Sequence, residues 1–118
     1  MAAATTARDV LVVDDERDIL DLLTDLLEEE GYRVRRAADG EAALAEIERA
    51  LPDLVVTDVM MPRLNGLELA RRLRERAVPT IVMSAAVSSV DDPCLVFISK
   101  PFDIDRLLDL VASVLESC

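Results

Sequence analysis

The chain of 118 residues carries 24 acidic and 13 basic side chains, which gives a formal net charge of −11. This length suits one domain, and a content of 52% hydrophobic but only 3% aromatic residues predicts an aliphatic core. The acid excess argues against direct binding of nucleic acid by this domain, because such binding depends on clustered Lys and Arg. The absence of histidine excludes histidine-based metal sites, Ser-His-Asp triads and a phosphohistidine carrier role.

Nothing in the sequence indicates secretion or a membrane. The apolar runs are far shorter than the roughly 20 residues of a membrane span. Residues 1–8 have neither the basic start nor the apolar segment of a signal peptide. Two cysteines, Cys94 and Cys118, do not make a disulfide framework. We therefore expect a cytoplasmic protein with a flexible tail at residues 1–8 and a single domain at residues 9–118.

Strand and helix patterns alternate from the start of this domain. Residues 10–13 form an apolar run of strand length. From Ile19 onward, apolar residues recur at helical spacing along one face, and Gly31 stands where such a helix would end. Residues 32–37 predict a second strand. A second helix is predicted to follow and to reach Leu51, its last apolar position before a proline.

The second half of the chain repeats this alternation. Residues 54–57 predict the third strand, and a helix follows from about residue 67 to 76. Residues 80–83 and 95–98 predict the last two strands, and a striped helix covers residues 104–115. Continuously apolar strands that alternate with helices indicate a parallel sheet covered on both faces. Because crossovers are right-handed, the predicted fold is a doubly wound α/β sheet of five strands.

Polar side chains follow four of the five predicted strands. Asp14 and Asp15 follow the first, Asp58 the third, Ser84 the fourth, and Lys100 lies just past the fifth. The carboxyl ends of parallel strands meet at one edge of such a sheet, where functional groups gather. Each residue alone has an ordinary explanation: Asp14 or Asp15 could cap the first helix, and Ser84 could satisfy a loop. Together, however, three carboxylates repel one another unless a cation lies among them.

A hard divalent cation fits this group of oxygen atoms. Mg²⁺ prefers oxygen ligands and typically uses one or two carboxylates together with phosphate oxygens. We predict Mg²⁺, with Mn²⁺ as an alternative ion. Asp15 and Asp58 would bind it directly, Asp14 through water, and the backbone carbonyl of Met60 would complete the protein ligands.

A carboxylate beside such a metal can attack phosphorus and form an acyl phosphate. We predict that Asp58 is this nucleophile. Catalysis of the transfer would consist of positioning and charge neutralisation. The metal would cover one side of the phosphoryl group, Lys100 another side, and the hydroxyl of Ser84 a third oxygen.

Four segments of the chain resemble the receiver domain of two-component response regulators. "VLVVDDERDI" is similar to the first strand of that family with its acidic pair, and "PDLVVTDVMMPRLNGLEL" to the phosphoacceptor strand and the loop after it. "VPTIVMSAA" and "VFISKPF" resemble the fourth strand and the Lys-Pro end of the fifth. The resemblance runs from about Asp9 to Leu115. It implies the flavodoxin-like strand order 2-1-3-4-5 of the chemotaxis members.

The resemblance also implies a partner and a switch. Asp58 would accept a phosphoryl group from a phosphohistidine on a sensor histidine kinase or phosphotransfer protein. Ser84 would then move toward the phosphate and Phe97 would turn inward, although Phe97 could equally be an ordinary core residue. Met60 and Ala86 stand at two positions that tune dephosphorylation in the family. Neither side chain can hydrogen-bond an attacking water, so we expect slow autodephosphorylation, over minutes or longer.

The chain departs from the family after Ser84. Ten residues, 85–94, separate it from the fifth strand, whereas a parallel crossover normally needs a dozen or more. "AAVSSVDDPC" has no helical stripe, so we expect the fourth helix of the family to be short or absent here. That helix belongs to the surface through which relatives dimerise or dock, and the departure argues against dimerisation through it.

The leading hypothesis is a phosphorylatable receiver domain that signals by conformational switching. It would act on a downstream protein or on an output domain outside this sequence, and would catalyse only its own phosphorylation and dephosphorylation. The alternative is a receiver-like interaction module whose altered region after Ser84 acts independently of phosphorylation. A third hypothesis, an aspartyl-phosphate phosphatase, would require an acid two residues after the nucleophile, where Met60 stands.

Overall fold

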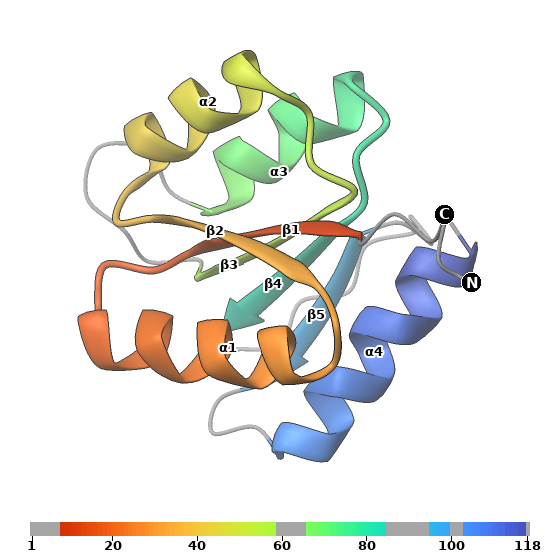
Figure 1. Ribbon diagram of the computed structural model, residues 1–118. Coiled ribbons are helices and arrows are strands. Elements are labelled where there is room, and N and C mark those ends of the chain that lie inside the picture. Colours follow the sequence, from red (N-terminus) through yellow and green to blue (C-terminus); the bar gives the residue numbers. More distant parts are fainter. Residues whose placement is uncertain (1–7, 59–65, 85–94, 100–102, 118) are drawn as a thin grey trace.

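The structure, a computed structural model, describes residues 8–58, 66–84, 95–99 and 103–117. These residues form a five-stranded parallel sheet with helices on both faces (Figure 1). The strand order is β2-β1-β3-β4-β5, which confirms the predicted doubly wound fold and its flavodoxin-like order. The elements in chain order are β1 (Asp9–Val13), α1 (Arg17–Glu29), β2 (Arg33–Ala37), α2 (Gly40–Arg49), β3 (Leu54–Asp58), α3 (Gly66–Glu75), β4 (Thr80–Ser84), β5 (Leu95–Ser99) and α4 (Ile104–Ser117).

The second helix ends earlier than its apolar spacing predicts. Helix α2 ends at Arg49, so the prediction that it reaches Leu51 was wrong. Ala50 has extended backbone and Leu51 is 50% exposed; a following proline disfavours helical backbone at Leu51. Residues 85–94, for which we predicted a short or absent helix, lie outside the described residues.

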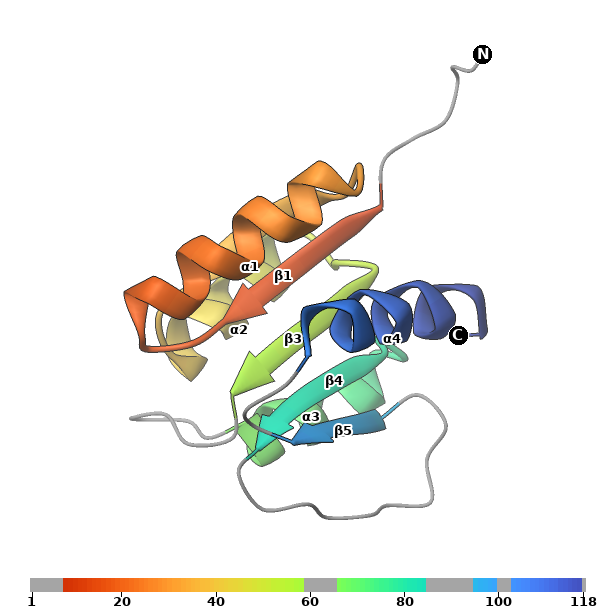
Figure 2. The same ribbon diagram turned by 90° about the horizontal axis from the view of Figure 1, so that it is seen from below.

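The two layers of helices bury alternate side chains of the strands. Helices α1 and α4 pack on one face of the sheet, and α2 and α3 on the other (Figure 1). Val10 and Val12 face α1, whereas Leu11 and Val13 face the opposite layer, because successive side chains of a strand point to opposite faces. The arrows of β1, β3, β4 and β5 point the same way, so their carboxyl ends lie at one edge (Figure 2).

Strand β2 is polar where the other strands are apolar. Its sequence is RVRRA, and it forms one border of the sheet. Charged side chains suit an edge strand because they discourage pairing with another chain. The expectation of continuously apolar strands therefore does not hold for β2.

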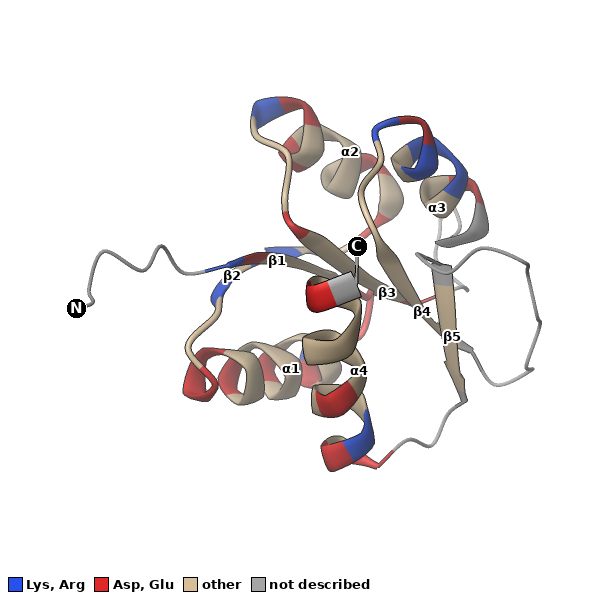
Figure 3. Ribbon diagram, turned by 90° about the vertical axis from the view of Figure 1, so that its right-hand side faces the viewer, with Lys and Arg blue, Asp and Glu red and all other residues tan. Residues whose placement is uncertain are grey.

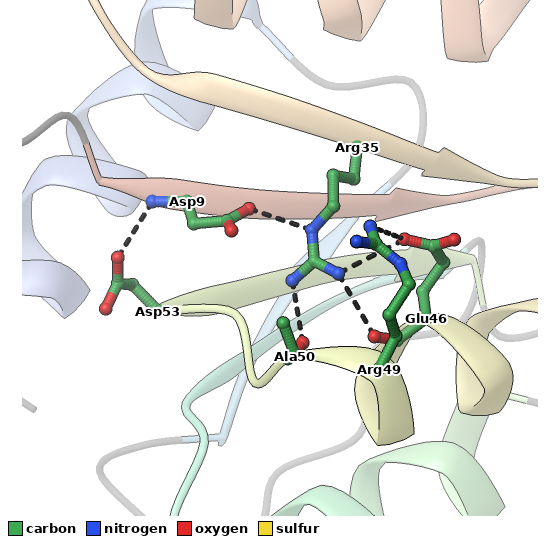
Figure 4. Close-up of polar contacts among 6 residues, drawn as sticks. All are labelled: Asp9, Arg35, Glu46, Arg49, Ala50 and Asp53. Atoms are coloured by element: carbon green, nitrogen blue, oxygen red, sulfur yellow. Dashed lines mark hydrogen bonds and ion pairs between the residues drawn. The ribbon is translucent and has the colours of Figure 1, made fainter.

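Arg35 of β2 joins three elements of the structure (Figure 4). Its Nε lies 3.1 Å from Oδ1 of Asp9 on β1, and its Nη1 lies 3.1 Å from Oε1 of Glu46 on α2. The guanidinium also donates to the carbonyl oxygens of Glu46, at 3.0 Å, and Ala50, at 2.8 Å. Ala50 directly follows the last residue of α2, so no further helical turn supplies a donor to its carbonyl, whereas the Glu46 carbonyl also accepts from the N–H of Ala50 at 3.1 Å. Arg35 thus caps α2 while it pairs with β1.

Charge is unevenly distributed over the surface of the described elements. Acidic residues spread along α1, whereas several arginines gather on α3 (Figure 3). Exposed ion pairs join Arg71 to Glu68 and Arg76 to Glu48. Exposed pairs of this kind contribute little to stability because water screens them.

Among the described residues, no helix has the length and apolarity that crossing a membrane requires.

Helices α1 and α3 end in the same hydrogen-bonded turn but with different residues. Gly31 follows α1 with φ 95°, and Ala77 follows α3 with φ 59°. Each donates its N–H to the carbonyl three residues back, and the next residue donates to the carbonyl five residues back. This pair of hydrogen bonds is the Schellman motif, in which the residue after the C-cap, here Gly31 or Ala77, has left-handed backbone. Glycine adopts that region freely, whereas the backbone of alanine is strained there because its Cβ comes too close to the following carbonyl oxygen.

Replacing Ala77 by glycine is expected to raise the free energy of unfolding by about 0.5–1 kcal/mol. The left-handed strain of alanine outweighs the greater flexibility that glycine brings to the unfolded chain. Urea unfolding followed by circular dichroism measures the change. The matched control, Ala45→Gly in the exposed middle of α2, is expected to lose about 1 kcal/mol. A less stable Ala77→Gly protein would contradict this account.

Candidate functional site

Three carboxylates lie together at the carboxyl edge of the sheet, as the strand-end pattern predicted. Asp14 and Asp15 follow β1, and Asp58 is the last residue of β3. These two strands are neighbours, and their register brings Val13 opposite Thr57. One carboxylate oxygen from each aspartate lies within 4.8 Å of the other two.

The three aspartates differ in burial. Asp14 is fully buried and Asp58 is 7% exposed, whereas Asp15 is exposed. A cation that arrives from solvent would therefore meet Asp15 first, with Asp58 and Asp14 beneath it. Buried negative charges at this spacing repel each other strongly unless a positive charge lies among them.

The donor set fits a hard cation. All three donors are carboxylate oxygens, which are the ligands that Mg²⁺ and Mn²⁺ prefer over softer metals. Two oxygens that bind one Mg²⁺ directly lie at most about 4.2 Å apart, because each is about 2.1 Å from the ion. A cluster gathered within 4.8 Å therefore needs little adjustment to place two carboxylates on one ion and the third beside it.

Asp14 also serves the start of α1. Its Oδ1 accepts a hydrogen bond from the N–H of Glu16 at 2.9 Å, and its own N–H donates to the carbonyl of Ala37 at 3.2 Å. Glu16 is the N-cap residue of α1 and makes no side-chain capping bond itself. Asp14 is therefore not the N-cap that the sequence offered as an alternative to a metal role, but it binds the N–H of the N-cap residue. The two roles are compatible, because the same carboxylate remains within the acidic cluster.

Asp58 is the last residue of a fully buried central strand. Every residue of β3 is buried, and the strand lies between β1 and β4. Thr57, directly before it, is fully buried, and its hydroxyl donates to the carbonyl oxygen of Asp58 at 2.9 Å. Sequence reasoning assigned no role to Thr57. The available signal was a hydroxyl in an otherwise apolar strand, next to the predicted nucleophile.

The other residues of the predicted site are only partly placed. Ser84 ends β4, the strand beside β3, so its backbone reaches the same edge as Asp58. Phe97 is half-buried within β5. Lys100, Met60 and Ala86 lie outside the described residues, and their roles stay predictions.

A parallel α/β sheet of this order defines a flavodoxin-like domain, and the carboxylates gathered at its carboxyl edge form a cluster that could hold a cation. A family model described as the response regulator receiver domain matches residues 10–112. The chain therefore belongs to the response regulator receiver family. Members of this family are signalling modules and not conventional enzymes.

Similar proteins agree with this assignment. The chain is 39% identical to the nitrogen assimilation regulatory protein NtrX of Azorhizobium caulinodans, over 94% of this chain and 27% of that protein. The receiver domain of NtrX from Brucella abortus has a TM-score of 0.80 at 37% identity, over 93% of this chain and 100% of that one. Chemotaxis protein CheY4 of Vibrio cholerae has a TM-score of 0.82 at 28% identity, over 92% and 99% of the two chains. The chain spans between 27% and 50% of the length of the first curated relatives it matches.

Proposed function

We propose that this receiver domain accepts a phosphoryl group on Asp58 from a sensor histidine kinase or a phosphotransfer protein. The reaction requires Mg²⁺, with Mn²⁺ as an alternative ion, and takes place in the cytoplasm. The acidic cluster at the sheet edge of a receiver-family chain carries this proposal. Phosphorylation changes the conformation of the domain, which then acts on a downstream protein or on an output domain, and the domain itself contacts no nucleic acid.

The residues of the cluster divide the work of this transfer. A carboxylate oxygen of Asp58 attacks the phosphorus of the donor, an oxygen–phosphorus bond forms, and the phosphorus–nitrogen bond to the donor histidine breaks. Asp15 and Asp58 would hold the metal directly, and Asp14 would hold it through water. When bound, Mg²⁺ supplies positive charge that offsets the carboxylates and the phosphoryl oxygens. Lys100 and Ser84 would contact the remaining phosphoryl oxygens.

A small-molecule acyl phosphate tests this proposal without the kinase. With Mg²⁺ present, the protein should gain the mass of one phosphoryl group, and peptide mapping should place it on Asp58. With a chelator in place of Mg²⁺, the gain should disappear. Modification of another residue, or equal uptake in the chelator, would refute the proposal.

A second candidate function is that of an interaction module whose region after Ser84 acts independently of phosphorylation. The connection of ten residues between β4 and β5 favours it, because this connection is short for a parallel crossover. Amide hydrogen exchange along β4 and β5, before and after phosphorylation, separates the two. A change on phosphorylation supports the switch, and unchanged exchange in a protein phosphorylated on Asp58 supports the interaction module.

Replacing Met60 by asparagine is expected to speed the loss of the phosphoryl group by roughly tenfold, which corresponds to about 1.4 kcal/mol of barrier. An amide can donate to and accept from the attacking water, whereas the thioether sulfur is only a weak acceptor. The decay of phosphoprotein after removal of the donor measures the rate. Met61→Asn, with the same chemistry one position along, serves as the control and should decay like the wild type. An unchanged rate in Met60→Asn would count against the proposed tuning role.

A further inference from the structure

The hydroxyl of Thr57 is unusual in its surroundings. Its side chain is fully buried and stands in β3 after Leu54, Val55 and Val56, which are all fully buried. Its partners in register, Val13 on β1 and Val82 on β4, are fully buried as well. Valine would fill this place with the same shape and without a polar group. Burying a hydroxyl costs free energy unless the hydroxyl is hydrogen-bonded, so the partner of this hydroxyl shows what the threonine does in the strand.

The acceptor of this bond lies at the candidate site. Oγ1 of Thr57 donates to the carbonyl oxygen of Asp58 at 2.9 Å. The register between β1 and β3 ends at Thr57, whereas the register between β3 and β4 continues to Asp58. The register with β1 therefore stops at the residue before Asp58, where β1 itself ends, and Asp58 is in register with Met83 of β4. The bond from Thr57 restrains the direction of the Asp58 carbonyl at that point.

We propose that Thr57 is a positioning residue that holds the backbone of Asp58 so that its carboxylate faces Asp14 and Asp15. This inference rests on the proposed function of Asp58. The direction of a side chain follows from the backbone that carries it, and small misplacements in a reacting group slow a reaction strongly. Thr57 does not touch the phosphoryl group. It acts through Asp58.

Two substitutions separate positioning from simple packing. Thr57→Val keeps the shape and removes the hydroxyl, whereas Thr57→Ser keeps the hydroxyl and removes a methyl group. If Thr57 only fills the core, Thr57→Ser should be the less stable variant, and both should bind Mg²⁺ and phosphoryl groups like the wild type. If Thr57 positions Asp58, the order of function is opposite to the order of stability: Thr57→Val is stable but impaired, and Thr57→Ser is less stable but active.

The expected loss in Thr57→Val is about tenfold in the affinity for Mg²⁺ and about tenfold in the phosphorylation rate at saturating Mg²⁺. Thr57→Ser should stay within about twofold of the wild type in both. Titration calorimetry of the unphosphorylated proteins measures the metal affinity, and urea unfolding measures the stability. Wild-type affinity and rate in Thr57→Val would overturn the inference.

The two readouts also keep this inference distinct from the proposed function. If the wild type binds Mg²⁺ but takes up no phosphoryl group, the proposed function fails, and the metal affinities of the two variants still decide the role of Thr57. If the wild type is phosphorylated on Asp58 and Thr57→Val behaves identically, the positioning role alone fails. A wild type that does not bind Mg²⁺ overturns both.

Discussion

Replacing Asp58 by asparagine is expected to abolish phosphoryl uptake and, in metal-free buffer, to stabilise the fold. The amide cannot serve as the nucleophile, so uptake should fall at least about a thousandfold. The free energy of unfolding should rise by about 1–2 kcal/mol, because one of three carboxylates gathered within 4.8 Å loses its charge. A residue that only packs the core would show the opposite sign of stability change.

Magnesium should change the stability of the wild type and of Asp58→Asn to different extents. A ligand that binds the folded state raises its stability, so Mg²⁺ should stabilise the wild type and stabilise Asp58→Asn much less. Urea unfolding with Mg²⁺ or with a chelator measures both effects, and intact mass measures uptake. Asp25→Asn, which removes an exposed charge on α1 outside the cluster, should keep the uptake and the response to Mg²⁺.

Two results would contradict this prediction in different ways. Uptake by Asp58→Asn would mean that another residue accepts the phosphoryl group. Lower stability of Asp58→Asn in the chelator would mean that repulsion does not dominate the empty cluster.

Replacing Arg35 by methionine is expected to lower the free energy of unfolding by about 2–4 kcal/mol. The Arg35 side chain is 12% exposed, and it pairs with Asp9 while it caps α2 through two carbonyls. Methionine would fill the space, but it leaves a partly buried carboxylate and two helix-end carbonyls without these donors. Urea or thermal unfolding measures the loss.

Arg36→Met is the matched control on the same strand. Arg36 pairs with Asp21, but these side chains are 41% and 54% exposed, so the loss should stay below about 1 kcal/mol. Equal losses in the two variants would show that burial does not govern the contribution of these arginines.

The effect of Arg35 should also depend on pH. Hydrogen bonds from Arg49 and Arg35 hold the pKa of Glu46 below its ordinary value of 4.5. A carboxylate with a lowered pKa in the folded state stabilises the fold above its unfolded pKa, and this contribution disappears as the pH falls through the lowered value. The difference between the wild type and Arg35→Met should therefore shrink below about pH 4.5, as repeated urea unfolding would show.

Much of the fold followed from local patterns. The alternation of strand-length apolar runs with helical stripes identified all nine elements of the described chain. It could do so because the spacing and the run length of buried apolar residues differ between a helix and a strand. The end of α2 was misplaced since Leu51 continues the apolar spacing. The actual end depends on Pro52, which directly follows Leu51, and on the hydrogen bonds that Arg35 of β2 donates to the carbonyls of Glu46 and Ala50.

The acidic cluster could be predicted because parallel strands bring their carboxyl ends to one edge, so residues far apart in sequence become neighbours by rule. Their unequal burial could not be predicted. Asp58 ends a strand in the middle of the sheet, whereas Asp15 stands one residue beyond the buried Asp14. These differences depend on how far each strand extends past its neighbours.

The sequence by itself determined the class of fold, the family and the residues that could carry phosphoryl chemistry, because each of these depends on residue type and periodic spacing. The tertiary structure decided how they are held: that Asp14 serves both α1 and the cluster, that Arg35 ties α2 to β1, and that Thr57 bonds to the carbonyl of Asp58. Those contacts depend on strand register and on the directions of side chains and carbonyls. Residue spacing along one chain carries no information about such directions until the strands are paired.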